Sequence, residues 1–242
     1  MIKLENVSFS FGLSNVSCRI PQGKLIGIMG ANGAGKSTLL KGIAGILPPA
    51  SGEIWLEHCK LSEMSAKQKS ERLAYFAQNT RIHWDLSVYD VIALGLPTPT
   101  KDESAKVRAI SAQFFLSHLL EKPFRQLSGG EQARVQLARC CIKQAPLLLA
   151  DEPIASLDPY YQIDMMERLK SLTPQKTCVM AIHHLDLAYR FCDEIILLDK
   201  GKILANGATQ AVLNAENLAR VFGVKVKMDQ AKREIFAVEK MT

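Results

Sequence analysis

The sequence lacks several features that would assign it to a common class of protein. None of its apolar runs approaches the roughly eighteen residues of a membrane span. Its six cysteines form no C-x-x-C pair, and no group of Cys and His residues has metal-site spacing, so we expect reduced, mostly packed thiols. The first residues lack the charged-then-apolar layout of a signal peptide, which predicts a protein that stays in the cytosol.

Concentrated charge is absent as well. The 242 residues carry a formal net charge of +6, yet Lys and Arg are scattered and form no long run. This pattern favours a mildly basic solvated surface over a nucleic-acid site, and we expect no nucleic-acid partner. No internal repeat or low-complexity tract is visible, and the 48% of hydrophobic residues suffice for one large core, alone or with an inserted subdomain.

The most informative segment present is a glycine-rich loop that fits G-x-x-x-x-G-K-[ST]. It consists of Gly30, Ala31, Asn32, Gly33, Ala34, Gly35, Lys36 and Ser37, and Thr38 follows it. An apolar run at 24–29 predicts a strand before the loop, and helical spacing at 37–47, stopped by two prolines, predicts a helix after it. Backbone amides of such a loop wrap phosphates, with Lys36 reaching the β- and γ-phosphates and Ser37 ligating Mg²⁺. The alternative is a tight glycine turn without a ligand.

A second candidate motif is an apolar run at 147–150 that ends on Asp151 and Glu152. At the carboxyl edge of a parallel sheet, Asp151 would hold Mg²⁺ through water, and Glu152 would polarise the water that attacks a γ-phosphate. Taken alone, such a pair is usually the solvated end of a strand. The phosphate loop upstream favours the functional interpretation.

The segment 127–131 predicts the start of a long helix. Ser128 has the properties of an N-cap, and Glu131 stands three residues later, as a capping box requires. Gly129 and Gly130 weaken the first turn and bare its amides, which would form a second anion site. Because one chain has no second phosphate for it, the natural occupant is a nucleotide held by another copy, which predicts a homodimer.

The remaining pattern predicts an α/β chain. Alternation at 2–5 and 7–11 indicates antiparallel strands with one wet face, and mostly helical spacing at 85–144 indicates a helical insert. Further strands are expected at 52–56, 73–77, 147–150, 177–182, 195–198 and 202–204, with short helices at 65–72 and 215–222 before a hairpin-like tail.

In this order, the motifs resemble those of the ATP-binding-cassette (ABC) ATPases, the nucleotide-binding subunits of transporters, over essentially the whole chain. The segment 127–131 matches the signature sequence of that family. By resemblance, Gln78 is the Q-loop glutamine that contacts Mg²⁺, and Asp158 belongs to the D-loop that crosses a dimer interface. His183 matches the switch histidine at the γ-phosphate, and Phe11 occupies the position that stacks on adenine.

Each of these assignments has a structural alternative. Gln78 could be a surface amide, and His183 could be a buried, satisfied histidine. His184 stands where the family usually has Asp, so it competes with His183 for the switch role. Phe11 could be a core aromatic residue, and Asp158 with the proline after it could simply start a helix.

The resemblance implies a P-loop NTPase (RecA-like) core with an N-terminal antiparallel β subdomain and an inserted α-helical subdomain. We expect one cassette domain over 1–242, with its core at about 1–84 and 145–242 and the helical subdomain at about 85–144. The implied cofactors are ATP and Mg²⁺, with Ser37, Gln78 and Asp151 positioning the metal. The implied assembly is a homodimer in which Ser128, Gly129 and Gly130 of one copy close over the ATP of the other.

Three further segments, 86–95, 183–188 and 217–224, are similar to importers of iron–siderophore complexes, haem and cobalamin. They imply a subunit bound peripherally, through polytopic permease subunits, to the cytoplasmic face of the inner membrane, with a substrate-binding protein acting indirectly. An iron–siderophore complex is the first cargo expected, and cobalamin or haem the second. Residues 78–95 would face the permease, where Trp84 either docks or packs the helical insert.

Two other functional classes remain as alternatives. A soluble cassette protein acting on ribosomes or DNA usually has two cassettes or a long coiled-coil insert, and neither is seen here. A non-catalytic nucleotide-binding regulator is disfavoured because both Glu152 and His183 are present.

Overall fold

A computed structural model describes residues 1–78, 85–97, 101–229 and 231–240. Its centre is a six-stranded sheet in the order β10-β9-β3-β8-β7-β6. The strands are β3 (Leu25–Gly30), β6 (Leu73–Phe76), β7 (Leu147–Asp151), β8 (Thr177–Ala181), β9 (Glu194–Asp199) and β10 (Lys202–Ala208). Only β10 runs antiparallel to its neighbour. Every residue of β3, β7 and β8 is buried, which explains their continuous apolar runs and confirms the expected parallel sheet.

The expected N-terminal antiparallel sheet is present, in the order β2-β1-β4-β5. It consists of β1 (Ile2–Ser8), β2 (Val16–Ile20), β4 (Ser51–Leu56) and β5 (Cys59–Lys60). The prediction of a strand at 7–11 was wrong. A single strand bends at Asn6, which has φ +50°, and ends at Ser8, while Phe9 turns into the core with 6% exposure. One of its two partners, β2, was missed, although its buried Val16, Cys18 and Ile20 alternate with exposed residues.

Helices cover the central sheet on both faces. The helix after the glycine loop, α1 (Lys36–Ile43), is shorter than the predicted 37–47, because Gly45 adopts φ +69° and ends it before the prolines. The helices that cover the core are α2 (Ala66–Arg72), α6 (Pro159–Ser171), α7 (Leu185–Phe191), α8 (Thr209–Val212) and α9 (Ala215–Phe222). The chain then forms the hairpin β11 (Val224–Asp229) and β12 (Glu234–Lys240).

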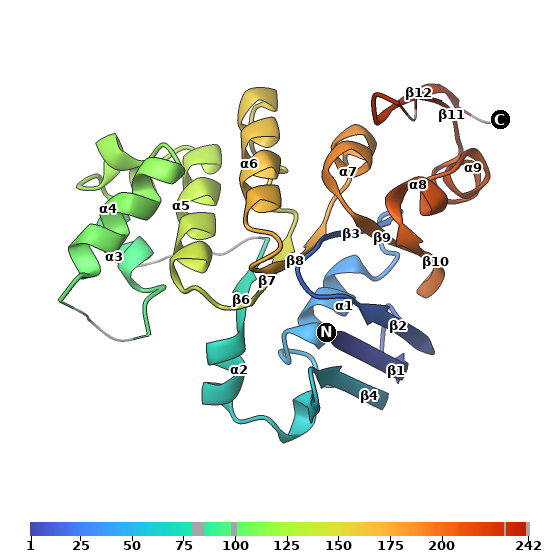
Figure 1. Cartoon of the computed structure of the whole chain (residues 1–242), viewed down its shortest axis with the longest axis horizontal. Helices are drawn as coiled ribbons and strands as arrows, with labels where there is room; N and C mark the ends of the chain where they lie inside the picture. The colour runs from blue at the N-terminus through green and yellow to red at the C-terminus, as the bar shows by residue number, and fades with distance from the viewer. Residues whose placement is uncertain (79–84, 98–100, 230, 241–242) are drawn as a thin grey trace.

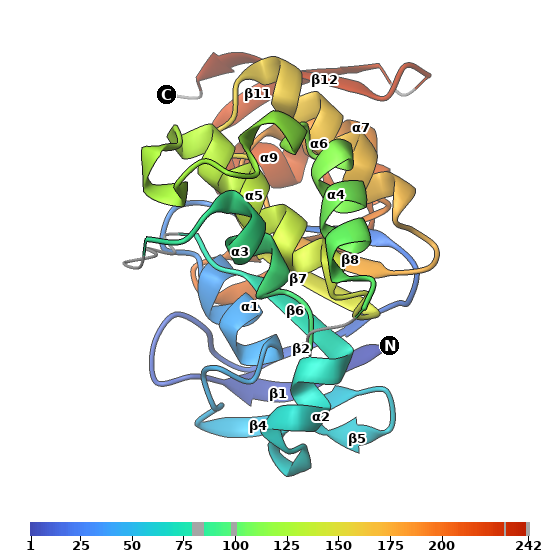
Figure 2. The ribbon, with the colours of Figure 1, turned by 90° about the vertical axis from the view of Figure 1, so that its left-hand side faces the viewer.

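The helices of the insert, α3 (Val88–Ala93), α4 (Glu103–Gln113) and α5 (Gly129–Ile142), stack at one end of the molecule (Figure 1). Seen from that end, they stand in front of the central sheet, with the antiparallel sheet below and the hairpin above (Figure 2). Apolar side chains from α5 and from one face of the sheet, such as Val135 and Leu148, belong to a single buried cluster. Trp84, for which docking or packing was expected, lies outside the described residues.

Among the described residues, no helix is both long and apolar enough to cross a bilayer. All six cysteines are free thiols, and five of them are buried, as expected. Burial raises the pKa of Cys18, Cys178 and Cys192 to about 12. Cys59, on β5 of the antiparallel sheet, is exposed.

Candidate functional site

The candidate residues gather at one edge of the central sheet. The glycine loop follows β3, Asp151 ends β7, Gln78 lies just after β6, and His183 just after β8. Because β3, β8, β7 and β6 are parallel neighbours, their carboxyl ends meet at the same edge, where open α/β sheets bind ligands.

The loop is compact and keeps a lysine inside it. Gly35 has φ +104°, and a Cβ there would lie 2.6 Å from the Gly12 carbonyl oxygen, so only glycine fits. Lys36 Nζ donates hydrogen bonds to the carbonyl oxygens of Gly30 and Ala31 at 2.9 and 3.0 Å. Burial lowers the pKa of Lys36, while the nearby carboxylates of Glu152 and Asp151 act in the opposite direction. The ammonium is therefore held within the loop, where a phosphate would be wrapped.

Ser37 and Asp151 form the part of the site that fits a divalent cation. The Ser37 hydroxyl donates to Asp151 Oδ1 at 3.0 Å, and Asp151 is only 2% exposed. Burial raises the pKa of Asp151, the bond from Ser37 opposes the shift, and the Glu152 charge reinforces it. A cation would remove the cost of this buried carboxylate, and hard oxygen donors of this kind suit Mg²⁺.

Glu152 is held by the two other predicted side chains. Gln78 Nε2 donates to its Oε2 at 2.6 Å, and His183 Nε2 lies 2.5 Å from its Oε1. Glu152 itself adopts φ +54°, an uncommon conformation for a residue with a side chain. This backbone turn directs the carboxylate toward Gln78 and His183 instead of continuing β7.

The structure separates the two neighbouring histidines. His184 is the N-cap residue of α7, and its Nε2 lies 3.4 Å from Gln162 Nε2 on α6. His183 alone of the two is bonded to Glu152 in the described structure. The geometry thus favours His183 over His184 for contact with a bound phosphate.

The segment before the glycine loop brings Phe11 to the site. Phe11 is 62% exposed, so the alternative of a core aromatic was wrong. Its neighbour Gly12 packs against the start of α1, where an added Cβ would lie 2.8 Å from Thr38 Oγ1. The exposed ring therefore lies beside the loop, where it could contact a base attached to the phosphates.

The start of α5 forms a second group, apart from the phosphate loop. Ser128 is the N-cap, and its capping box with Glu131 is present. In the described structure no hydrogen bond joins Ser128, Gly129 or Gly130 to the glycine loop. Gly130 instead approaches Ser156, where an added Cβ would lie 3.1 Å from the Ser156 carbonyl oxygen.

Asp158 is the N-cap of α6, with a proline at the first helical position, so the helix-start interpretation also holds.

Sequence reasoning missed Gln136, a buried residue of α5. It lines a cavity together with Gln78, Gly129 and Glu152, which were predicted as site residues, and with Ser156. The available signal was an amide inside the apolar run Val-Gln-Leu-Ala at 135–138 of a helix.

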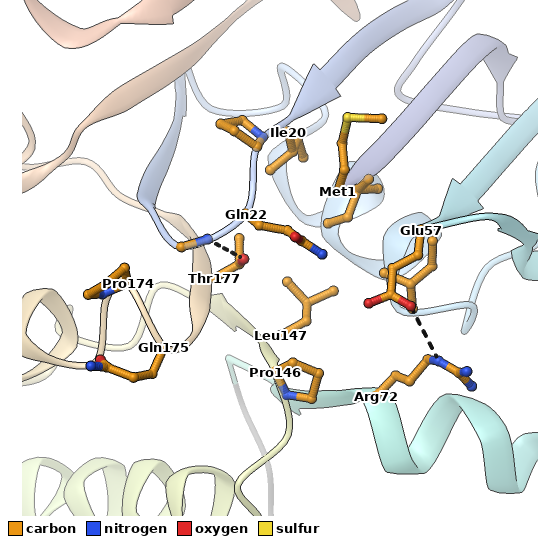
Figure 3. A pocket seen from close by; sticks show the side chains of 14 residues that line it. Met1, Ile20, Gln22, Glu57, Arg72, Pro146, Leu147, Pro174, Gln175 and Thr177 are labelled. Atoms are coloured by element: carbon orange, nitrogen blue, oxygen red, sulfur yellow. Dashed lines mark hydrogen bonds and ion pairs between the residues drawn. The ribbon is translucent and has the colours of Figure 1, made fainter.

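A different hollow lies at the opposite edge of the sheet, before the start of β7 and β8 (Figure 3). Pro146, Leu147 and Thr177 line it from the sheet, and the ion pair of Arg72 with Glu57 closes one side. It contains none of the predicted site residues, so the carboxyl edge is the better candidate.

Comparisons with known proteins agree with this geometry. The family model described as ABC transporter matches residues 13–155. The hemin import ATP-binding protein of Bordetella pertussis is 38% identical over 227 residues, which cover 88% of this chain and 87% of that protein. The ferric enterobactin transport ATP-binding protein of Escherichia coli K12 is 33% identical over 221 residues, which cover 87% of this chain and 81% of that protein.

A solved structure is also similar over most of the chain. It is an ATP-binding cassette in a dimeric, post-hydrolysis state with ADP and phosphate bound. The TM-score is 0.80 at 26% sequence identity, and the match covers 86% of this chain and 99% of that one.

Proposed function

The chain belongs to the ABC transporter family, and we propose that it is the ATPase subunit that powers a membrane importer. It binds ATP and hydrolyses it, as subunits of this family do. One observation supports the proposal most strongly: three groups meet at one edge of the sheet. They are the glycine loop, the buried carboxylate of Asp151, and the carboxylate of Glu152, which contacts two side chains.

The proposed nucleotide site uses residues 30–38 of the loop to wrap the phosphates, with the Lys36 ammonium turning from two carbonyls to the β- and γ-phosphates. Ser37, Asp151 and Gln78 would hold Mg²⁺, which neutralises phosphate charge and aligns the oxygens. The proposed role of Phe11 is to stack on adenine, a contact supported by its exposure beside the loop.

In the proposed hydrolysis step, Glu152 accepts a proton from the attacking water, whose oxygen bonds to the γ-phosphorus while the bond to ADP breaks. His183 contacts the γ-phosphate and helps to orient Glu152, a role supported by their hydrogen bond. Asp158 would lie at the contact between two copies of the chain. These roles form one hypothesis about the site, and substitutions of its members are the test.

We propose that the working unit is a homodimer. Ser128 and Gly129 are exposed at the first turn of α5. The Ser128 amide donates to Glu131, and no hydrogen bond joins Ser128 or Gly129 to the described glycine loop of the same chain. Two copies arranged face to face would let Ser128, Gly129 and Gly130 of each close over the γ-phosphate held by the other. The similar cassette solved with ADP and phosphate is itself dimeric.

We further propose that the segment 78–95 binds polytopic permease subunits, which would hold the chain at the cytoplasmic face of the inner membrane. Leu94 is 59% exposed there, beside a hollow lined by Leu96, Pro97, Arg139 and Lys143. The division into a core of about 1–84 and 145–242 and a helical subdomain of about 85–144 is part of the same proposal. A substrate-binding protein would act through the permease.

The proposed cargo is an iron chelate. Relatives named for hemin import and for ferric enterobactin transport support this class, and the higher identity of the hemin relative favours haem over a siderophore. Cobalamin is the alternative cargo, and a soluble cassette without a permease is the alternative class.

The decisive experiment deletes the gene and measures growth on hemin, on a ferric siderophore or on an inorganic iron salt as sole iron source. Loss of growth on one chelate, restored by the wild-type chain but not by Glu152→Gln, supports both the import role and that cargo. Normal growth on every chelate, with cobalamin uptake also intact, contradicts the importer. Co-purification with ribosomes or DNA, and not with a membrane protein, favours the soluble alternative.

A further inference from the structure

Among the residues that the structure describes, Gln136 is a buried amide without a hydrogen-bond partner. It is 5% exposed, and neither its Nε2 nor its Oε1 is paired or reached by solvent. Leaving a buried amide unpaired destabilises the conformation that contains it, and a change that supplies a partner is favoured. The arrangement of α5 in this structure is therefore not the one that best satisfies Gln136.

The side chain faces the candidate site. It lines a cavity with Gln78, Glu152 and Ser156, and α5 packs against β6, the strand that leads to Gln78. The same helix begins at the Ser128–Gly130 turn, two helical turns before Gln136. A shift of α5 that follows nucleotide contact at its first turn would therefore also move the Gln136 amide relative to Gln78 and Glu152.

Glu152 is in contact with two neighbouring side chains in this arrangement. One carboxylate oxygen accepts the Gln78 amide at 2.6 Å, and the other contacts His183 at 2.5 Å. Each oxygen thus already has one neighbour at hydrogen-bond distance, and the Gln78 amide takes an acceptor position that an attacking water could use. Among the described side chains that line the cavity, Gln136 has a buried and unpaired oxygen that could accept the Gln78 amide instead.

We propose that Gln136 is a positioning residue for hydrolysis. When bound nucleotide shifts α5, Gln136 Oε1 accepts the hydrogen bond from the Gln78 side-chain amide. Glu152 Oε2, which accepted that bond before, then becomes available to the attacking water. This inference rests on the proposed nucleotide site and on the proposed homodimer, in which the first turn of α5 contacts the nucleotide of the other copy. It adds the exchange of one hydrogen-bond acceptor, from Glu152 to Gln136. The Gln136 side-chain oxygen is therefore unpaired without nucleotide and paired when nucleotide is bound.

The test is Gln136→Leu, which removes the amide at similar volume. Without nucleotide, its melting temperature should rise by at least about 2 °C, because an unpaired buried amide is lost. Adding Mg²⁺ and a non-hydrolysable ATP analogue should raise the melting temperature of the variant less than that of the wild type, because the variant cannot form the Gln78–Gln136 hydrogen bond of the nucleotide-bound state. The kcat should fall about tenfold with an unchanged KM for ATP.

The matched control is Gln132→Leu. Gln132 lines the same cavity one turn earlier, but its Nε2 already donates to the Leu127 carbonyl at 3.0 Å. This variant should lose melting temperature without nucleotide and keep both the wild-type analogue-induced gain and the wild-type kcat. A merely structural role for Gln136 would leave both the analogue-induced gain in melting temperature and the kcat of Gln136→Leu at their wild-type values, as in Gln132→Leu.

The inference is overturned if Gln136→Leu keeps the wild-type kcat, or if its analogue-induced gain in melting temperature equals that of the wild type. If Gln136→Leu does not fold, Gln136→Met is held to the same criteria. The nucleotide site is checked separately with Lys36→Ala, which should abolish the analogue-induced gain. A wild-type protein that shows no gain contradicts the proposed function itself.

Discussion

Replacing Glu152 by Gln tests the proposed hydrolysis step with little change in shape. Glu152 is bonded to Gln78 and to His183, and its side chain is 16% exposed. A glutamine keeps one acceptor oxygen for Gln78, and its amide can donate to His183 if that ring presents an unprotonated Nε2. Both contacts can therefore persist, so the fold should be retained and ATP should still bind.

The expected loss is in the chemical step. General-base assistance contributes about 10²- to 10⁴-fold, which is about 3–5 kcal/mol of transition-state stabilisation. We expect kcat to fall by at least about a hundredfold. Stability should change by less than about 2 kcal/mol, since at most one charge-assisted hydrogen bond is weakened. With turnover blocked, ATP should remain bound and the dimer should persist.

The assay is phosphate release by the purified protein, with retained ATP and molar mass measured on the same sample. Glu167→Gln is the control, because it makes the same chemical change on an exposed carboxylate of α6 and should leave turnover unchanged. A kcat for Glu152→Gln within a few-fold of the wild type would refute the assignment of the base. A trapped, ATP-loaded protein that stays monomeric, alone and with its membrane partner, would refute the proposed dimer.

Three other substitutions follow from the same structure. Phe11→Ala should weaken ATP binding about 2- to 10-fold, because stacking contributes about 0.5–1.5 kcal/mol. Nucleotide titration checks this, and an equal loss in Phe236→Ala, an exposed aromatic on β12, would contradict it. Burial raises the pKa of Asp151, so the wild type loses stability as pH rises from the ordinary carboxyl range through that raised pKa. Without nucleotide, Asp151→Asn should be more stable than the wild type at pH 7. Its free energy of unfolding should also increase less than that of the wild type when the pH is lowered. Urea midpoints from pH 4 to 8 measure the difference, and a variant less stable at pH 7 contradicts it. Leu39→Ala, at a fully buried position, should lower the free energy of unfolding by about 2–5 kcal/mol, whereas Ile46→Ala at 58% exposure should change it little. Equal urea midpoints for these last two variants would contradict the packing.

Local patterns predicted most of the fold. The parallel strands were evident because both of their faces are buried, and Ser128 caps α5 as its sequence indicates. The failures occurred where one backbone conformation decides the outcome. Asn6 bends β1, and Gly45 ends α1 early; neither φ can be read from a hydrophobic pattern.

The positions of the site residues followed from topology, since the carboxyl ends of parallel strands meet at one edge. Sequence reasoning could not foresee that Glu152 is bonded on both sides, because Gln78 and His183 come from strands distant in the chain. Gln136 was missed because its neighbours also come from other segments. The roles of Gln78, Gln136, Glu152 and His183 are predictions, and substitutions such as those above are their test.

The uneven exposure of the cysteines makes the native chain suitable for selective labelling. Of its six thiols, only Cys59 is exposed, on the antiparallel sheet and away from the carboxyl edge. A maleimide dye should therefore attach at one position without any engineered substitution. Two labelled copies would report their mutual distance by energy transfer while ATP is bound and consumed.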